Sequence, residues 1–311
     1  MESYCNAFGS YMRRSFGEIV YKVNVDAGFT CPNRDGTIGY GGCIYCNNDS
    51  FRPSACTPAL GIKAQVQRGI TYLTRRYKSK KFIVYFQPYT NTYADVAELE
   101  KLYREALDHP AVVGLAIGTR PDCVDEDKIS LLEDLAKDYF VLVEYGIQSI
   151  YDKSLVFINR GHDYNCFLNT LNLTKGRGIH IGAHIIAGFP TETIEEMQCM
   201  AYELSALPID FLKIHQLQVV KNTRLAVMYE NSPFHVFGYE EYLDFIAEFV
   251  ERLSPRIVVQ RMFALSPDDI LIAPRWSKTR QEIIRDIDNL FKSRHVVQGE
   301  KAQATIMSSS E

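Results

Sequence analysis

Short apolar runs alternate with longer amphipathic segments over the first 220 residues of the chain. Runs of β-branched and aromatic residues predict strands, whereas apolar positions that recur every three to four residues predict helices. The predicted strands cover 18–25, 81–87, 111–118, 139–148, 179–189 and 210–220. The predicted helices cover 59–77, 94–108, 125–138, 150–157, 163–176 and 191–204, the last opening at Thr191. Such strand–helix units with nearly continuous apolar strands indicate a parallel sheet covered by helices.

About six of these units fit an α/β fold of the partial (β/α)6 TIM-type barrel class. A doubly wound open sheet is the alternative, because periodicity alone does not separate the two architectures. After residue 222 the alternation loosens into a helix at 239–253, a strand at 256–262 and a charged helix at 277–293. We therefore expect a core domain over residues 1–222 and a C-terminal α/β extension over 223–311 packed on it. The polar tail at 296–311 is expected to be flexible.

Charge and composition narrow the range of functions. The chain has 311 residues and a formal net charge of −4 at pH 7, so it lacks the overall basic excess of many nucleic-acid-binding domains. It has no apolar run of about 18 residues, which argues against a membrane span. The N-terminal segment lacks a signal-peptide core, so a cytoplasmic location is expected. Eight cysteines without a secretion signal favour metal ligands or reactive thiols over disulfides.

Three of the cysteines lie in one glycine-rich segment, CPNRDGTIGYGGCIYC, within a predicted loop over residues 26–53. Cys31, Cys43 and Cys46 have the spacing C-x11-C-x2-C. Thiolates are soft ligands that favour iron–sulfur clusters and zinc. Three ligands are one short of a closed structural site, so either a fourth ligand comes from elsewhere or one metal position stays open. A structural zinc knuckle is the alternative, although Cys56 and Cys123 lack the pair spacing that such sites ordinarily have.

The loop, with Tyr45 just before its last cysteine, resembles the radical S-adenosylmethionine (radical SAM) signature. The commonest form of that signature has three residues between the first two cysteines, whereas eleven intervene here. The longer spacing resembles one subfamily. The segments CPNRDG, GGCIYC, FQPYTNTY, GTRPDC, EYGIQS, NRGH and AGFPTET occur in this order. Together they resemble the YhcC/YtqA-type radical SAM proteins, related to the Elp3/MiaB-like group, over residues 5 to 276.

This resemblance implies a cofactor set and a reaction. Cys31, Cys43 and Cys46 would be the metal ligands and catalytic residues that hold a [4Fe–4S] cluster, whose fourth iron binds SAM. Reductive cleavage of SAM would give a 5′-deoxyadenosyl radical that abstracts hydrogen from a substrate. An electron donor such as flavodoxin or ferredoxin and a tRNA are the implied partners, with a wobble-uridine side chain as substrate. The competing hypothesis is a non-enzymatic zinc- or iron–sulfur-stabilised binding or electron-transfer protein.

The resemblance also implies residues that contact SAM. Tyr45 would lie near the adenine, and Arg160 would hold the SAM carboxylate as a bidentate partner. Glu144 lies inside an apolar strand, where a carboxylate is costly unless paired, so it contacts SAM or forms a structural ion pair. His184 is either functional or a satisfied core histidine. The full set of implied cofactor-binding residues is Tyr45, Gln87, Glu144, Gln148, Arg160, His184, Ile186 and Gly188.

Other polar residues follow the predicted strands and are candidates for substrate contact. A period of two places Lys213 and His215 on one face of the sixth strand, and a buried lysine there suggests a substrate contact. Asp122 is expected either to cap the next helix or to be functional. Arg261 and the segment 273–276 would close the open side of the barrel or grip substrate. The candidate substrate residues are Asn91, Arg120, His162, Lys213, His215 and Lys221.

Overall fold

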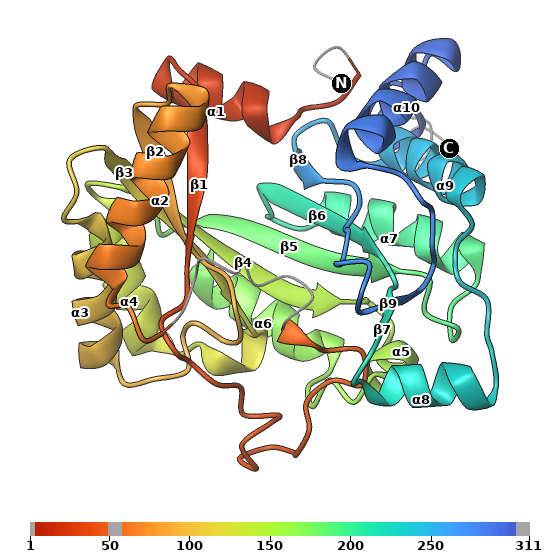
Figure 1. Cartoon of the computed structure of the whole chain (residues 1–311), viewed down its shortest axis with the longest axis horizontal. Helices are drawn as coiled ribbons and strands as arrows, with labels where there is room; N and C mark the ends of the chain where they lie inside the picture. The colour runs from red at the N-terminus through yellow and green to blue at the C-terminus, as the bar shows by residue number, and fades with distance from the viewer. Residues whose placement is uncertain (1–3, 49–57, 303–311) are drawn as a thin grey trace, which may run out of the picture.

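Seven parallel strands form one curled sheet in the order β1-β2-β3-β4-β5-β6-β8 (Figure 1). The structure is a computed structural model that describes residues 4–48 and 58–302. The strands are β1 (Val20–Val25), β2 (Lys81–Phe86), β3 (Val112–Thr119), β4 (Phe140–Gln148), β5 (His180–Ala187), β6 (Phe211–Gln216) and β8 (Val258–Arg261). Strand order follows chain order, without the reversal that defines a doubly wound sheet. The predicted partial barrel is therefore confirmed, and the open-sheet alternative is wrong.

The last part of the sheet differs from the prediction. The single strand expected at 210–220 is two strands, because the chain turns out of the sheet after β6. Its second half, β7 (Val219–Val220), pairs antiparallel with β9 (Leu271–Ala273). The strand expected at 256–262, in the C-terminal extension, belongs to the main sheet, since β8 pairs in parallel with β6 as its seventh strand. The C-terminal residues thus complete the barrel wall.

Helices follow the strands along the outer face of the sheet (Figure 1). They are α2 (Ile62–Tyr77), α3 (Val96–Leu107), the 3₁₀ turn η2 (Pro121–Cys123), α4 (Glu126–Ala136), α5 (Asp152–Phe157), α6 (Tyr164–Thr174) and α7 (Ile194–Ala206). After β7 come α8 (Arg224–Asn231), α9 (Tyr239–Arg252) and α10 (Arg280–Ser293). None of the described helices is both long and apolar enough to cross a membrane.

Two helix starts are corrected by the structure. The cap of α7 is Thr193 rather than Thr191, and it forms a reciprocal capping box with Glu196. The cap of α4 is Asp125, whose carboxylate accepts a hydrogen bond from the Lys128 backbone N–H. Asp122 therefore does not cap α4.

A helix that the sequence pattern did not predict closes one end of the half-barrel. This helix, α1 (Phe8–Phe16), precedes β1 and lies at the amino-terminal ends of the strands (Figure 1). Its Met12 is buried in an apolar cluster that also contains Val20, Ile83, Tyr85, Ala116, Leu142, Phe211 and Val258. Burial of this cluster is the driving force that holds α1 against the sheet. The cluster forms an apolar floor at the base of the barrel interior.

The curl of the sheet brings its first and last strands within side-chain reach. Lys22 of β1 donates a hydrogen bond from Nζ to Oε1 of Gln260 in β8 at 2.7 Å. The edge of β8 is also covered by the N-terminal segment, through a parallel bridge between Ala7 and Val259. These contacts explain why a sheet of seven strands encloses a well rather than an open surface.

The beginning of the tail is ordered by contacts, contrary to the prediction. Val296 is fully buried, and Gln298 is nearly so. The Gln298 side-chain amide donates to the carbonyls of Ser254 and Ile257, and its oxygen accepts from the Asn6 backbone N–H, each at 2.8 Å. Residues 296–302 therefore tie α10 to the N-terminal segment, and the rest of the predicted tail lies outside the described residues.

Candidate functional site

The three-cysteine loop follows β1 and lies at the carboxyl-terminal side of the sheet. Two tight turns shape it, with backbone hydrogen bonds from Arg34 to Cys31 at 2.8 Å and from Cys46 to Cys43 at 2.9 Å. Gly42 has a φ of 79°, and a Cβ there would lie 2.9 Å from Nε of Arg34. Only glycine accommodates both this left-handed backbone and the guanidinium beside it. Cys56 lies outside the described residues.

Hydrogen-bond donors surround the thiol groups. Arg160 directs Nη1 at the sulfur of Cys43 from 3.5 Å, and Arg120 directs Nη1 at the sulfur of Cys31 from 4.0 Å. Asn33 places its amide 3.8 Å from the Cys43 sulfur, and Arg34 donates to the Cys46 carbonyl at 2.6 Å. Cationic donors at these positions stabilise thiolates, which are the metal-binding form of cysteine.

The donor set fits a [4Fe–4S] cluster with one open iron. A single zinc ion draws its ligands onto one point. Within residues 4–48 and 58–302, no three His, Cys, Asp or Glu side chains converge in that way. In an iron–sulfur cluster each cysteine binds a different iron, so thiols spaced along one loop suit it. Burial raises the pKa of the Cys46 thiol, and nearby Cys43 adds to the rise. A bound metal ion stabilises the thiolate form and would oppose this effect.

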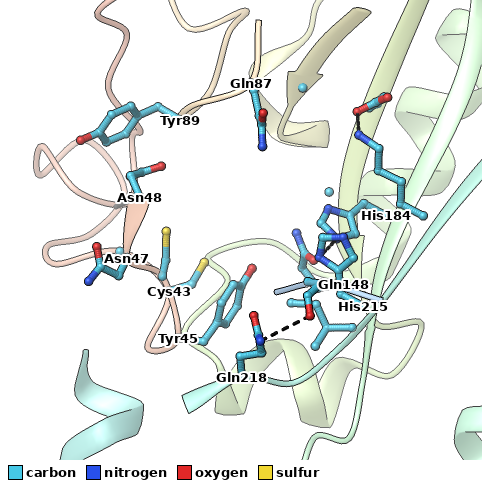
Figure 2. Close-up of a pocket in the computed structure, with 18 of the residues that line it drawn as sticks. Cys43, Tyr45, Asn47, Asn48, Gln87, Tyr89, Gln148, His184, His215 and Gln218 are labelled. Atoms are coloured by element: carbon cyan, nitrogen blue, oxygen red, sulfur yellow. Dashed lines mark hydrogen bonds and ion pairs between the residues drawn. The ribbon is translucent and has the colours of Figure 1, made fainter. Parts of the chain in front are cut away.

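The loop opens onto a cavity of about 240 Å³ inside the half-barrel. In Figure 2, Cys43 and Tyr45 lie on one side of this space, and His184 and His215 lie on the opposite side. Most of the residues predicted for the site line it. They are Cys31, Cys43, Tyr45, Cys46, Gln87, Arg120, Glu144, Gln148, Arg160, His184, Ile186, Lys213 and His215. The structure thus brings these residues together from the loop and the ends of the strands.

Four predicted site residues do not line the cavity. Asn91 is buried and donates from Nδ2 to the carbonyls of Phe86 and Gly118, which ties β2 to β3. The Lys221 side chain is exposed on the surface. Gly188 has a φ of 103°, and a Cβ there would meet the Phe237 ring at 3.1 Å. Asn91 and Gly188 therefore have structural reasons for their residue types, whereas Lys221 only lies outside the cavity.

His162 is the fourth of these residues, and it lies close enough to Arg160 and Asp122 for their charges to act on it. Its Nδ1 contacts the Asp163 carbonyl at 3.0 Å. Burial lowers the pKa of His162 to about 4, and Arg160 adds to the effect. Asp122, on the same side, forms a bidentate ion pair with Arg120. These contacts orient the guanidinium toward Cys31.

The carboxyl end of β4 carries an irregular backbone at the edge of the cavity. Its pairing with β5 shifts between Gly146 and Gln148, and Gln148 has a φ of 69°. Such bulges and left-handed residues concentrate at functional sites. The Gln148 Oε1 is buried without a hydrogen-bond partner, and so is the Nε of Arg160. Unpaired buried polar atoms are costly, so both atoms are candidates for ligand contacts.

A charged layer lies deeper in the well, just above the apolar floor. The two carboxylate oxygens of Glu144 receive hydrogen bonds from Lys22, at 2.8 Å, and from Lys213. Lys213 also lies 2.9 Å from the Tyr85 hydroxyl. Glu144 is therefore in the ion-pair arrangement that was the alternative to a SAM contact, although it also borders the cavity.

Burial and ion pairing together set the pKa values of the charged groups in this layer. Burial opposes the ionisation of Glu144, but the ammonium groups of Lys213 and Lys22 outweigh it and hold its pKa well below the usual range. Burial lowers the pKa of Lys213 to about 7 despite the attraction of Glu144. The Lys213 ammonium thus loses its proton far more readily than an exposed lysine.

A histidine pair forms the next layer. Nε2 of His184 lies 2.9 Å from Nδ1 of His215, and Nη1 of Arg261 lies 3.4 Å from Nε2 of His215. Arg261 can only donate, so Nε2 of His215 accepts, and its Nδ1–H donates to His184. Burial lowers the pKa of His184 to about 3 and that of His215 well below its usual value. Both rings are therefore neutral at pH 7.

Several residues of this site were not predicted from the sequence. Lys22 and Tyr85 belong to none of the quoted segments, although Lys22 interrupts an apolar strand in the same way as Glu144, and Gly146 lies inside the EYGIQS segment. Asn33 and Arg34 lie inside the CPNRDG segment, between Cys31 and Cys43. That position could have identified them as neighbours of the thiol groups. The partners of Lys22 lie 122 and 238 positions away, which no local pattern specifies.

Known proteins share this combination of sequence and fold. The chain matches the radical SAM superfamily over residues 31–201 and the Radical_SAM C-terminal domain over residues 209–292. It is 32% identical to the uncharacterized protein YtqA of Bacillus subtilis, over 93% of this chain and 90% of that protein. It is 34% identical to protein YhcC of Escherichia coli, over 96% of each chain.

Two more distant matches involve longer proteins. A tRNA uridine(34) acetyltransferase of Methanocaldococcus infernus is 30% identical over 47% of this chain and 27% of that protein. The solved structure of the archaeal Methanocaldococcus infernus Elp3 superposes with a TM-score of 0.68 and 18% identity, covering 90% of this chain and 64% of that chain. At that identity the superposition shows a shared fold.

The chain belongs to the radical SAM superfamily and is an enzyme of that class. Within the superfamily it is of the YhcC/YtqA type. A [4Fe–4S] cluster and SAM are therefore its cofactors, in agreement with the three thiols and the adjoining cavity.

Proposed function

We propose that Cys31, Cys43 and Cys46 hold the cluster, and that SAM binds between the loop and the ends of β4, β5 and β6. The bound cluster supplies the electron that breaks the S–C5′ bond of SAM, which yields a 5′-deoxyadenosyl radical that abstracts hydrogen from the substrate. One observation carries this proposal. The three thiols border the same cavity as the unpaired buried atoms of Gln148 and Arg160.

The side chains around the cavity are suited to orient SAM. Arg160 keeps one buried N–H without a partner, which suits the SAM carboxylate. Gln148 offers an unpaired carbonyl oxygen that suits a ribose hydroxyl or the amino group. Tyr45 and Ile186 border the cavity and belong to one apolar cluster, which suits the adenine ring.

The test is a turnover assay with protein prepared and reconstituted under anaerobic conditions. Wild-type protein should bind iron and release 5′-deoxyadenosine from SAM when a reductant is added. Cys43→Ala should abolish both iron binding and the product, because one thiolate is lost. Cys199→Ala is the matched control, since Cys199 is exposed on α7 and does not border the cavity. Zinc in place of iron, or cleavage unaffected by Cys43→Ala, would contradict the proposal.

We further propose that the substrate is a tRNA and that the reacting group is a wobble-uridine side chain. The support is the similarity to tRNA uridine(34) acetyltransferases over about half of this chain. Nucleosides from the tRNA of a strain lacking the gene should show a loss or change of one modified uridine by mass spectrometry. Addition of total tRNA from that strain should also raise 5′-deoxyadenosine formation. An unchanged nucleoside profile would reject the tRNA substrate and leave the cleavage of SAM standing.

Reduction of the cluster requires an external electron donor. We propose a small low-potential protein such as flavodoxin or ferredoxin in this role. Either protein with its reductase should replace the chemical reductant in the assay and support 5′-deoxyadenosine release. If the chemical reductant supports product formation but neither protein does so in its place, these donors are rejected.

A further inference from the structure

Cationic side chains line the cavity at both of its ends. Among the described residues that line it, Glu144 is the one carboxylate, whereas Arg34, Arg120, Arg160, Lys213 and Arg261 are cationic. The first three arginines lie beside the cysteines, where thiolates offset their charge. Lys213 and Arg261 belong to the opposite end, and their charges are not balanced in this way.

The closed end of the cavity, which lies next to the apolar floor and away from the cysteine loop, holds one carboxylate among several cations. Glu144 is 4% exposed, and its oxygens are divided between Lys22, which is 19% exposed, and Lys213, which is 8% exposed. One carboxylate therefore serves two ammonium groups. Arg261 faces Lys213 in the register of β6 and β8. In the described part of the chain, no carboxylate lies within 4.0 Å of Arg261, and the neutral His215 ring is its side-chain partner.

Lys213 is 8% exposed and Arg261 is half-buried. Cations withdrawn from water are costly unless a group of opposite charge accompanies them, and a ligand can supply that charge. The neutral histidines cannot supply it, and the Tyr85 hydroxyl cannot either, because burial and Glu144 raise its pKa well above the usual value. With its lysines protonated, the layer holds the three cations Lys22, Lys213 and Arg261 against the single carboxylate of Glu144, and Lys213 and Arg261 line the cavity. Glu144 and the Tyr85 hydroxyl hold Lys213 in place, so its ammonium is already oriented before a ligand arrives.

We infer that the closed end of the cavity binds an anionic oxygen group of the substrate, a carboxylate or a phosphate, through Lys213 and Arg261. This inference rests on the proposed function, because it names a chemical class for the substrate of the same cavity. The position of the layer gives the orientation of that substrate. Lys213 bonds Tyr85, which belongs to the apolar floor, so the anionic end lies deepest and the rest of the substrate extends toward the cysteine loop.

A binding experiment tests this without turnover. Acetate and inorganic phosphate are the anionic probes, and acetamide is the neutral probe of the same shape as acetate. Their effect on thermal unfolding of the anaerobically reconstituted protein is measured at constant ionic strength, with SAM present and absent. A ligand that binds the native state raises the midpoint by mass action. We expect at least one anion to stabilise the protein when SAM is bound, and acetamide to have no such effect.

The variants assign the response to the closed end. Arg261→Gln and Lys213→Met should each weaken anion binding about tenfold or more, as expected for loss of a charge-assisted contact. Arg285→Gln is the control, because Arg285 is 63% exposed and lies outside the cavity. A stronger response to acetate would indicate a carboxylate substrate, and a stronger response to phosphate would indicate a phosphate ester.

Three results would overturn the inference. The first is that neither acetate nor phosphate stabilises the wild-type protein more than acetamide does, a result that does not depend on whether any variant folds. The second is anion binding that Arg261→Gln leaves unchanged. The third is loss of anion binding when SAM is added, which would assign the site to the carboxylate of SAM itself. Release of 5′-deoxyadenosine is scored separately, so failure of the proposed function is distinguishable from failure of this inference.

Discussion

Replacement of Glu144 by glutamine tests the charged layer directly. The substitution keeps the size of the side chain but leaves Lys22 and Lys213 without their shared carboxylate. Removal of one partner from a buried ion pair costs ~3–5 kcal/mol, because the remaining charge stays desolvated. Lys213 can limit the loss by releasing its proton, since burial already lowers its pKa to about 7. We therefore expect the free energy of unfolding to fall by about 3 kcal/mol at neutral pH.

The stability lost in Glu144→Gln should also depend on pH, and the pKa of Lys213 gives the direction. The pKa of Lys213 falls from 10.5 in the unfolded chain to about 7 in the fold, which corresponds to ~5 kcal/mol against its charged form. The folded state therefore binds fewer protons between these values, and stability rises with pH across this window. With glutamine at position 144, no carboxylate opposes the effect of burial on Lys213, so the pKa of Lys213 falls further. The rise in stability with pH then starts at a lower pH. The stability lost on substitution is then larger at pH 6 than at pH 9.

Urea unfolding of the apoprotein, followed by circular dichroism at both pH values, measures these differences. Glu133→Gln is the matched control. Its carboxylate is 42% exposed and pairs with Arg177 on the surface, so its loss should cost under about 1 kcal/mol. If Glu144→Gln costs no more than this control, or costs the same at pH 6 and pH 9, the buried ion-pair reasoning is refuted.

Three further predictions concern other parts of the site and the fold. Gly146→Ala should raise the KM for SAM about tenfold, the cost of ~1.4 kcal/mol of binding, since its Cβ would lie 2.5 Å from Nε2 of Gln148. Gly9→Ala is the control for that assay, because its Cβ would meet nothing within 4 Å. Asn91→Ala should lower the free energy of unfolding by ~2 kcal/mol, because two buried carbonyls lose a donor. In that variant the KM for SAM should not change, which kinetic assays would check. Thr193→Ala should cost about 1 kcal/mol through loss of the α7 cap, and a cost near zero in urea unfolding would contradict the capping assignment.

The sequence was sufficient where a feature depends on neighbouring positions. Apolar runs and helical periodicity predicted six strands of the barrel wall and the helices that follow them, because burial of one face operates within a dozen residues. The cysteine spacing predicted a thiolate metal site, iron–sulfur or zinc, for the same reason, since three ligands within 16 residues share one loop. The resemblance to radical SAM proteins then pointed to the cluster. The alternation along β6 placed Lys213 and His215 on one face, and both border the cavity.

Only the tertiary structure decided which distant residues meet. Lys22, Glu144, Lys213 and Gln260 come from four strands, and their contact depends on the curl of the whole sheet. The floor beneath them is closed by α1, whose packing against Phe211 and Val258 depends on that same curl. Strand curvature is the sum of small twists at every pairing, so no short stretch of residues specifies it. Residues close in the sequence therefore indicate the chemistry of the cysteine loop, whereas the buried charge arrangement exists only after the barrel has formed.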